Sequence, residues 1–319
     1  MSPAFDLQLA LIALIVEGLL GYSDTLYRFI GHPVTWLGAI LSRLEGWLNR
    51  GDDRRQKGVT ALVILLSVAF AVSMIIQFGL PEDFFGLIVA ALVGSVLLAQ
   101  RSLYVHVRAV AEGLAIDLQS GRAAVSQIVG RDPEQLDEAG VVRAAIESLS
   151  ENFSDGIVAP AFWMAVLGLP GAALYKAANT ADSMIGHLNP RYREFGWAAA
   201  RFDDWINLPA SRLAALWLMI AAAFTRGASM VNAGKAVWRD ARLHRSPNAG
   251  WPEAAMAGAL GLKLGGPRSY DKVMVKDAYM GDGRREATLD DLNLALIVYR
   301  RACSMQIFVV GLVVLMWPV

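Results

Sequence analysis

Three acidic side chains recur every four residues near the middle of the chain. Glu147, Glu151 and Asp155 would lie on one face of a helix. Arg143 precedes them by the same step, and a row of like charges needs such a compensating cation. Carboxylate oxygens, with the amide oxygen of Asn152, suit Mg²⁺ and the phosphates it carries. A solvated helix face is the alternative, but this row leads directly into an apolar segment, which favours a site.

The helix that carries the acidic row has recognisable start signals. Asp132 is a good N-cap, Pro133 fits the first helical position and Gln135 completes a capping box. The sequence therefore predicts a helix that runs from this point to about Asn152.

A second polar group follows the next apolar run. Lys176, Asn179 and Ser183 would share one side of a helix, with Asp182 adjacent to them. Polar groups at the end of a membrane segment are costly without partners, so they are functional candidates.

A third group lies directly ahead of another apolar run, which itself contains Arg212. Asp203, Asp204 and Asn207 could bind a metal ion. A helix cap at the membrane interface explains the same residues about equally well.

Two turn-forming segments complete the candidates. His32 precedes a proline, so its backbone is extended; its ring could hold a phosphate or substrate, or mark a plain turn beside the interfacial Trp36. Residues 246–253 form a turn followed by a helix start, whose exposed N–H groups suit an anion. The polar side chains of interest there are Ser246, Asn248 and Glu253.

Apolar segments must position these groups. The chain of 319 residues is 55% hydrophobic and 18% charged, whereas soluble domains have about 45–50% apolar residues. Because a spanning helix needs about 20 apolar residues, the sequence predicts one all-α, polytopic membrane domain (1–319) with broken or re-entrant helices and cytoplasmic helical segments. The expected membrane segments are 7–20, 59–80, 84–99, 157–175, 208–224 and 307–319, and the expected cytoplasmic polar segments are 21–58, 100–156, 176–207 and 225–303.

The basic residues orient these segments. All 29 lie within residues 28–57, 101–143, 176–212 and 226–301, and none lies in the turn 81–83. Since Lys and Arg concentrate in the cytoplasmic loops of membrane proteins, this turn should lie on the opposite side of the membrane and join two antiparallel helices. Gly168 and Pro170 predict a turn inside segment 157–175. The preferred topology is a re-entrant segment that enters and leaves the membrane on the same side. The alternative is two true spans, which carry residues 176–212 across the membrane and back. A net charge of zero gives no hint of nucleic-acid partners.

Common nucleotide and metal motifs are absent. The chain has no Gly-x-x-x-x-Gly-Lys-Ser/Thr loop, no Gly-x-Gly-x-x-Gly after a strand and no His-Glu-x-x-His. Any nucleotide site must be non-standard. The single cysteine, Cys303, is best explained as a small buried residue.

The polar stretches, taken in order, resemble the cobinamide-phosphate synthase family of cobalamin biosynthesis, the CobD and CbiB proteins. The resemblance covers residues 31–267 and is most specific in 143–156, 175–184 and 246–253. Residues 271–301 are less distinctive.

This resemblance implies a ligase of the cytoplasmic (inner) membrane with its active site on the cytoplasmic side. It would join the propionate carboxylate of adenosylcobyric acid to the amine of (R)-1-amino-2-propanol or its O-phosphate, using ATP and Mg²⁺, to give adenosylcobinamide or its phosphate. It leaves open whether the chain forms a homo-oligomer or a complex with other membrane-bound B12 assembly enzymes.

The candidate residues fit this chemistry. The expected catalytic residues are Glu147, Glu151, Asp155 and Lys176; the expected metal ligands are Glu147, Glu151, Asp155, Asp203, Asp204 and Asn207; and the expected substrate-binding residues are His32, Arg143, Asn152, Asn179, Asp182, Ser183, Arg212, Ser246, Asn248 and Glu253. A groove lined by Trp36, Trp163, Trp205 and Trp251 is a hypothesis for binding the large corrin ring.

Three other functions would also use polar groups beside membrane segments. A transporter would place charge inside true spans, whereas these clusters lie mostly at segment ends. A lipid-linked phosphotransferase would carry the pattern Asp-Gly-x-x-Ala-Arg, whereas Asp155-Gly156 is followed here by Ile-Val-Ala-Pro at residues 157–160. A non-catalytic scaffold for membrane-bound B12 enzymes would tolerate substitution of the carboxylates.

Overall fold

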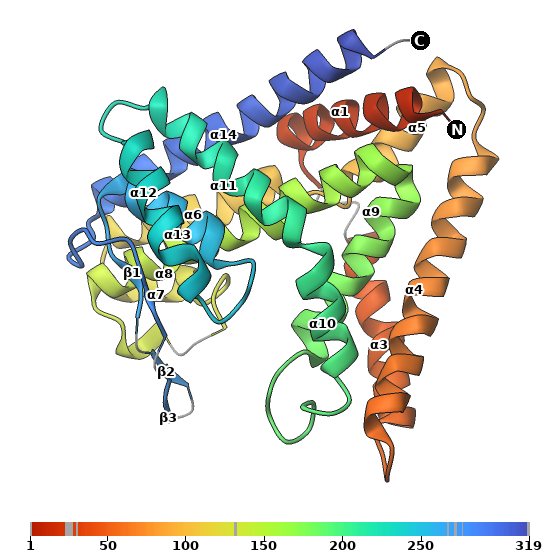
Figure 1. The fold of residues 1–319 in the computed structure, drawn as a ribbon, viewed down its shortest axis with the longest axis horizontal. Helices are drawn as coiled ribbons and strands as arrows, with labels where there is room; N and C mark the ends of the chain where they lie inside the picture. The colour runs from red at the N-terminus through yellow and green to blue at the C-terminus, as the bar shows by residue number, and fades with distance from the viewer. Residues whose placement is uncertain are drawn as a thin grey trace. The chain divides into compact units, whose positions relative to one another are not determined.

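Helices make up nearly all of the protein. The computed structural model describes residues 2–22, 28–29, 31–130, 133–266, 268–270, 273–275 and 277–317. The chain divides into two compact units (Figure 1). Unit 1 comprises residues 1–99, 159–207 and 309–319, and unit 2 comprises 100–158 and 208–308.

Five helical stretches among the described residues are long and apolar enough to cross a membrane. They are Pro3–Leu20, Arg54–Gly79, Phe84–Leu114, Glu138–Ile185 and Leu289–Met316, with a sixth if Trp197–Ile206 and Leu208–Ala223 form one span. The prediction of an all-α, multi-pass membrane protein is therefore confirmed.

Unit 1 is built around one long helix that packs against its neighbours. Its helices are α1 (Pro3–Leu20), α3 (Pro33–Leu48), α4 (Arg54–Gly79), α5 (Phe84–Ser95), α9 (Ala159–Ile185) and α10 (Trp197–Ile206). Helix α9 contacts α1, α4 and α10, while α3 packs against α4 and α9. Helix α9 therefore contacts helices from residues 1–99 as well as α10 from its own segment, 159–207.

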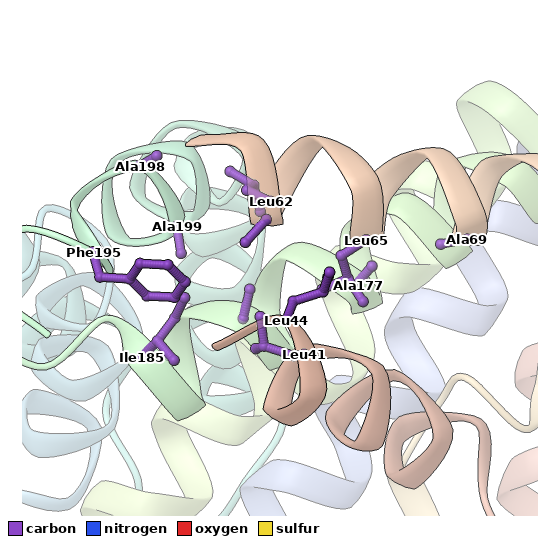
Figure 2. Close-up of a cluster of buried hydrophobic side chains, with 12 residues drawn as sticks. Leu41, Leu44, Leu62, Leu65, Ala69, Ala177, Ile185, Phe195, Ala198 and Ala199 are labelled. Carbon is purple, nitrogen blue, oxygen red and sulfur yellow. The ribbon is translucent and has the colours of Figure 1, made fainter. Parts of the chain in front are cut away.

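Small side chains let the helices of unit 1 approach closely. Figure 2 shows Leu62 and Leu65 of α4 facing Ala177 of α9 and Ala199 of α10, within a fully apolar cluster. Gly58 of α4 has no room for a larger side chain, because a Cβ there would lie 1.8 Å from the carbonyl oxygen of Phe195. Close packing of small residues is the usual way that helices associate in lipid.

Helices α4 and α5 do not form the packed hairpin that the short turn 81–83 suggested. Helix α5 packs against α1 and α9 instead. An apolar cavity of about 510 Å³ lies between the residues of α4 around Val72 and those of α5 around Val93. The short turn joins α4 to α5, but the partners of α5 are set by tertiary packing.

Helix α9 is broken where Gly168 and Pro170 predicted a turn. Gly168 has φ 66° and ψ −154°, a conformation open essentially only to glycine. The chain continues as helix on both sides of this residue, so the expected turn is a kink within one long element (Figure 1).

Unit 2 contains shorter helices and two small sheets. Its elements are α6 (Gln100–Leu114), α7 (Leu118–Val125), η1 (Pro133–Gln135), α8 (Glu138–Phe153), η2 (Ser154–Val158), α11 (Leu208–Ala223), α12 (Met230–Asp240), η3 (Ala241–Leu243), α13 (Gly250–Leu260), β1 (Leu264–Gly265), β2 (Arg268–Tyr270), β3 (Val273–Val275), β4 (Tyr279–Met280) and α14 (Leu289–Met316), whose end from residue 309 is counted with unit 1. β1 pairs with β4 and β2 with β3, both antiparallel. Helix α14 begins well before the predicted membrane segment at 307–319.

The helix of the acidic row begins later than predicted. Pro133–Gln135 form only a 3₁₀ turn, and α8 starts at Glu138. Its N-cap is Asp137, whose Oδ1 accepts a hydrogen bond from Gly140 N at 2.7 Å. The start at Pro133 is therefore wrong, because a second aspartate five residues on provides the cap; Asp132 lies outside the described residues.

Candidate functional site

The first residue of the acidic row is a buried anchor. Glu147 is only 5% exposed, and its Oε1 accepts a hydrogen bond from Gly265 N at 2.8 Å. This bond joins α8 to β1, 118 residues further along the chain. Glu147 therefore holds the loop that follows α13 against the acidic helix.

The other two carboxylates of the row are more accessible. Glu151 is exposed, and Asp155 is partly buried. Between them the helix changes from α to π geometry, over Ser154–Val158. Such wide turns often occur at functional sites. Asp155 therefore lies on a π-helical turn, and not in the α-helix that carries Glu147 and Glu151.

Arg143 and Asn152 both bond to the backbone. Arg143 donates to the carbonyl oxygen of Arg285, and its Nη2 lies 4.0 Å from Asp137 Oδ1. Asn152 Nδ2 donates to Ser148 O at 2.9 Å. Arg143 thus contacts Asp137 at the start of α8 and the backbone at Arg285.

Arg212 is held in unit 2 by hydrogen bonds and an aromatic ring. Its Nη1 donates to Ser211 Oγ and to Asn248 Oδ1, each at 2.9 Å. The guanidinium also lies over the ring of Trp251, 4.4 Å from its centroid. Because Ser211 and Asn248 are buried, this arrangement fixes the plane of a cation that could bind phosphate.

The segment 246–253 forms the turn and helix start that the sequence predicted. Ser246 Oγ accepts hydrogen bonds from the N–H groups of Asn248 and Ala249, at 3.1 and 3.2 Å. Helix α13 then begins at Gly250. Glu253 is buried in its first turn, with Oε1 3.9 Å from His244 Nε2. Ser246 therefore shapes the loop that presents Asn248 to Arg212.

The elements of unit 2 that carry these residues pack against one another. The π-helical turn with Asp155 contacts α11, which carries Arg212, and α13 contacts both α8 and α11. Unit 2 thus carries the acidic oxygens and the guanidinium on elements that pack against one another.

In unit 1, His32 and Lys176 lie near each other. His32 is the N-cap of α3, and its Nδ1 accepts from Val34 N at 3.2 Å. Burial, and then the charge of Lys176, hold the pKa of His32 below its ordinary value of 6.5. The imidazole is therefore neutral at neutral pH, and it carries a structural cap as well as any binding role.

The polar end of α9 joins α10 through a hydrogen-bonded chain. Tyr175 OH donates to Asn207 Oδ1 at 2.9 Å, and Asn207 Nδ2 donates to Asp203 Oδ2 at 3.0 Å. Asn179 lies beside the same carboxylate. All of this is largely buried, since Asp203 is 8% and Asn207 1% exposed.

Two further carboxylates surround this chain. Asp182 and Asp204 lie close enough to Asp203 to interact with its charge, and both are partly buried. Ser183 is exposed on α9, apart from the chain. Unit 1 therefore gathers most of its predicted residues, with Asp203 at the centre.

Metal binding stays a prediction. No group of three or more His, Cys, Asp or Glu side chains in metal-binding geometry occurs among the described residues. Mg²⁺ usually keeps several waters and binds through one or two carboxylates together with substrate phosphates. Glu151 with Asp155 in unit 2, or Asp203 with Asn207 in unit 1, offers oxygen donors of that kind.

The four tryptophans of the proposed corrin groove divide between the units. Trp36 and Trp205 are exposed, whereas Trp163 donates from Nε1 to Ile206 O at 3.1 Å. These three belong to unit 1, and Trp251 belongs to unit 2, stacked on Arg212.

Sequence reasoning gave no role to three residues that organise the clusters. Tyr175 links α9 to Asn207, Ser211 fixes Arg212, and Gly265 binds Glu147. The first two adjoin the predicted residues Lys176 and Arg212, which is a usable signal. No such signal points to Gly265, because its partner Glu147 is 118 residues away in the sequence.

These features define a class: a polytopic helical membrane protein with polar, partly buried clusters at the ends of its apolar helices. A family model described as CobD/Cbib protein matches residues 10–299. The chain is 48% identical over 310 residues to a cobalamin biosynthesis protein CobD of Rhodobacter capsulatus, covering 97% of both chains. It is 50% identical over 301 residues to the CobD of Sinorhizobium fredii (92% of each) and 46% identical over 303 residues to that of Brucella suis (92% and 93%). No solved structure matches the chain significantly.

The protein therefore belongs to the CobD/CbiB family of cobalamin biosynthesis proteins.

Proposed function

We propose that the protein is the ligase that joins adenosylcobyric acid to (R)-1-amino-2-propanol or its O-phosphate. The product is adenosylcobinamide or its phosphate, and ATP drives the step. The family membership supports a role in cobalamin biosynthesis, and similar proteins are named for that pathway. The reaction itself is what the resemblance to this family implies, and the polar groups of the chain fit it.

Amide formation from a carboxylate needs activation. Transfer of the terminal phosphoryl group of ATP to the propionate oxygen would give an acyl phosphate and ADP. Attack of the amine on the acyl carbon then forms the C–N bond and releases phosphate. A cation must hold the phosphoryl oxygens in the transition state, and a base must take one proton from the amine nitrogen.

The single observation that carries this proposal is the packing in unit 2 of the π-helical turn with Asp155 against α11, the helix with Arg212. Arg212, fixed by Asn248 and stacked on Trp251, is the proposed phosphate-binding group. Glu151, exposed at the end of α8, is the proposed base, and Asp155 is its neighbour on the π-helical turn. Mg²⁺ bound by these carboxylates would neutralise charge on the phosphates.

Unit 1 carries a separate group of proposed substrate-binding residues. Lys176 is proposed to bind an anionic group of a substrate, and Asn179 and Asp182 are proposed to orient the amine. The site is proposed to face the cytoplasm, where ATP is available, in the inner membrane. Homo-oligomers, or complexes with other membrane-bound B12 assembly enzymes, are part of the proposal.

The test is amide formation by the purified, detergent-solubilised protein. Adenosylcobyric acid, each amine and Mg-ATP are supplied, and product is followed by mass spectrometry. We expect product and ADP from the wild type and a loss of about 10²-fold or more in Glu151→Gln, the usual contribution of a general base. Glu138→Gln, an exposed glutamate at the other end of the same helix, is the matched control and should keep full activity.

Absence of product from a folded wild type that still binds the corrinoid would favour a scaffold. Product formation that does not need ATP would refute the acyl-phosphate route.

A further inference from the structure

Helix α9 exposes backbone polar groups inside unit 1. At Gly168 the backbone leaves helical geometry, and Pro170 follows two residues later. Since proline has no N–H, the carbonyl of Val166 has lost its partner at position i+4. The N–H of Leu169 donates to Gln77 Oε1 of α4, at 2.7 Å. The break is therefore a polar spot between helices that are otherwise apolar.

Two side-chain oxygens converge on this break. A Cβ at Gly168 would lie 2.5 Å from Gln77 Oε1, 2.7 Å from Gln77 Nε2 and 2.7 Å from Asp6 Oδ1, so all three atoms approach the same place on the backbone. Asp6 comes from α1 and Gln77 from α4, and these helices both pack against α9. Side-chain oxygens from two helices thus meet at the backbone break of a third.

The carboxylate at this spot is buried and incompletely paired. Asp6 is 8% exposed and Gln77 5% exposed. Asp6 Oδ1 accepts no hydrogen bond from any described residue. Burying an ionised carboxylate among apolar helices is costly unless the carboxylate takes up a proton or pairs with a cation.

We propose that Asp6, Gln77 and the broken backbone at Gly168 form a binding site for a monovalent cation, Na⁺. Asp6 Oδ1 and Gln77 Oε1 are hard oxygen donors of the kind that alkali cations take. One carboxylate balances one positive charge, whereas divalent cations in proteins take more carboxylates or a phosphate. Carbonyls freed at an interrupted helix bind Na⁺ in other membrane proteins.

The site has a consequence for the rest of unit 1. The half of α9 that follows the break carries Tyr175 and Lys176, and it starts at the N–H that Gln77 accepts. A cation that ties α1 and α4 to the break would fix where this half-helix begins. The proposal does not depend on the ligase reaction, since it concerns binding and stability.

The test is thermal unfolding of the full, purified protein in detergent without corrinoid or ATP. NaCl is titrated against choline chloride at constant ionic strength, with KCl as a second comparison. We expect the unfolding temperature to rise with NaCl and then level off, because a ligand that binds only the folded state stabilises it. Little change is expected with KCl or choline. In Asp6→Asn the response to NaCl should disappear.

A matched control lies on the same helix as Gln77. Ser73 is buried, and its Oγ donates to Ala69 O at 2.7 Å; Ser73→Ala should keep the full response to NaCl. Equal effects of NaCl, KCl and choline chloride in the wild type would overturn the proposal, and this outcome needs no variant to fold. A full NaCl response in folded Asp6→Asn would also overturn it. So would stabilisation by acid alone, since Asp6 would then hold a proton.

Discussion

Two substitutions of Glu147, to Ala and to Gln, separate the structural role of its hydrogen bond to Gly265 from any catalytic role. The side chain is 5% exposed, and Oε1 accepts the Gly265 N–H at 2.8 Å. Glu147→Ala leaves that N–H without its acceptor, and hydrogen bonds to charged groups contribute about 1.5–3 kcal/mol. Glu147→Gln keeps an acceptor oxygen at the same position and should cost about 1 kcal/mol, since neutral hydrogen bonds are roughly half as strong.

Hydrogen exchange at β1 measures this bond directly. A loss of about 2 kcal/mol corresponds to roughly thirtyfold faster exchange of the Gly265 amide in Glu147→Ala. We expect a much smaller change in Glu147→Gln and none in Glu138→Ala, an exposed control on the same helix. Unchanged exchange at residues 264–265 in Glu147→Ala would refute the anchoring role. Full ligase activity of Glu147→Gln would further show that the charge of Glu147 is not needed for catalysis.

Three shorter predictions concern other contacts of the clusters. Tyr175→Phe should lower stability by about 1–2 kcal/mol in chemical unfolding, because Asn207 Oδ1 loses its donor; an unchanged midpoint would contradict this. His32→Asn should keep the cap of α3, whereas His32→Ala should lose about 1 kcal/mol; equal stability of the two variants would refute capping by His32. Arg212→Lys should raise the KM for ATP about tenfold, since lysine keeps the charge but loses both the planar contact with Asn248 and the stacking on Trp251; an unchanged KM would remove Arg212 from the phosphate site.

Local signals in the sequence predicted the local features well. Gly168 and Pro170 mark the break in α9, because each disfavours helix for a covalent reason. The turn at 246–249 and the start of α13 follow from Ser246, whose hydroxyl caps the next N–H groups. Apolar length alone predicted most of the membrane helices.

Contacts between distant segments were not predictable in this way. Glu147 and Gly265 are 118 residues apart, so nothing near either one indicates the bond. The start of α8 depended on which of two nearby aspartates caps it, and Asp137 does so by bonding to Gly140. The packing of α5 was missed because a short connection to α4 does not determine which helices α5 packs against.

The discontinuity of unit 1 sets the order in which the protein can be assembled. Residues 1–99 are synthesised before the 59 residues of unit 2 that precede α9. The contact between Gly58 and the carbonyl of Phe195 can form only after Phe195 has been synthesised, 137 residues later. At 5–20 residues per second, this synthesis takes on the order of ten seconds. During this interval α1 and α4 stand in the bilayer without α9, and Asp6 and Gln77 lack the backbone break that they later face. Newly made chains should therefore depend on the insertion machinery to shelter these two polar side chains until α9 arrives.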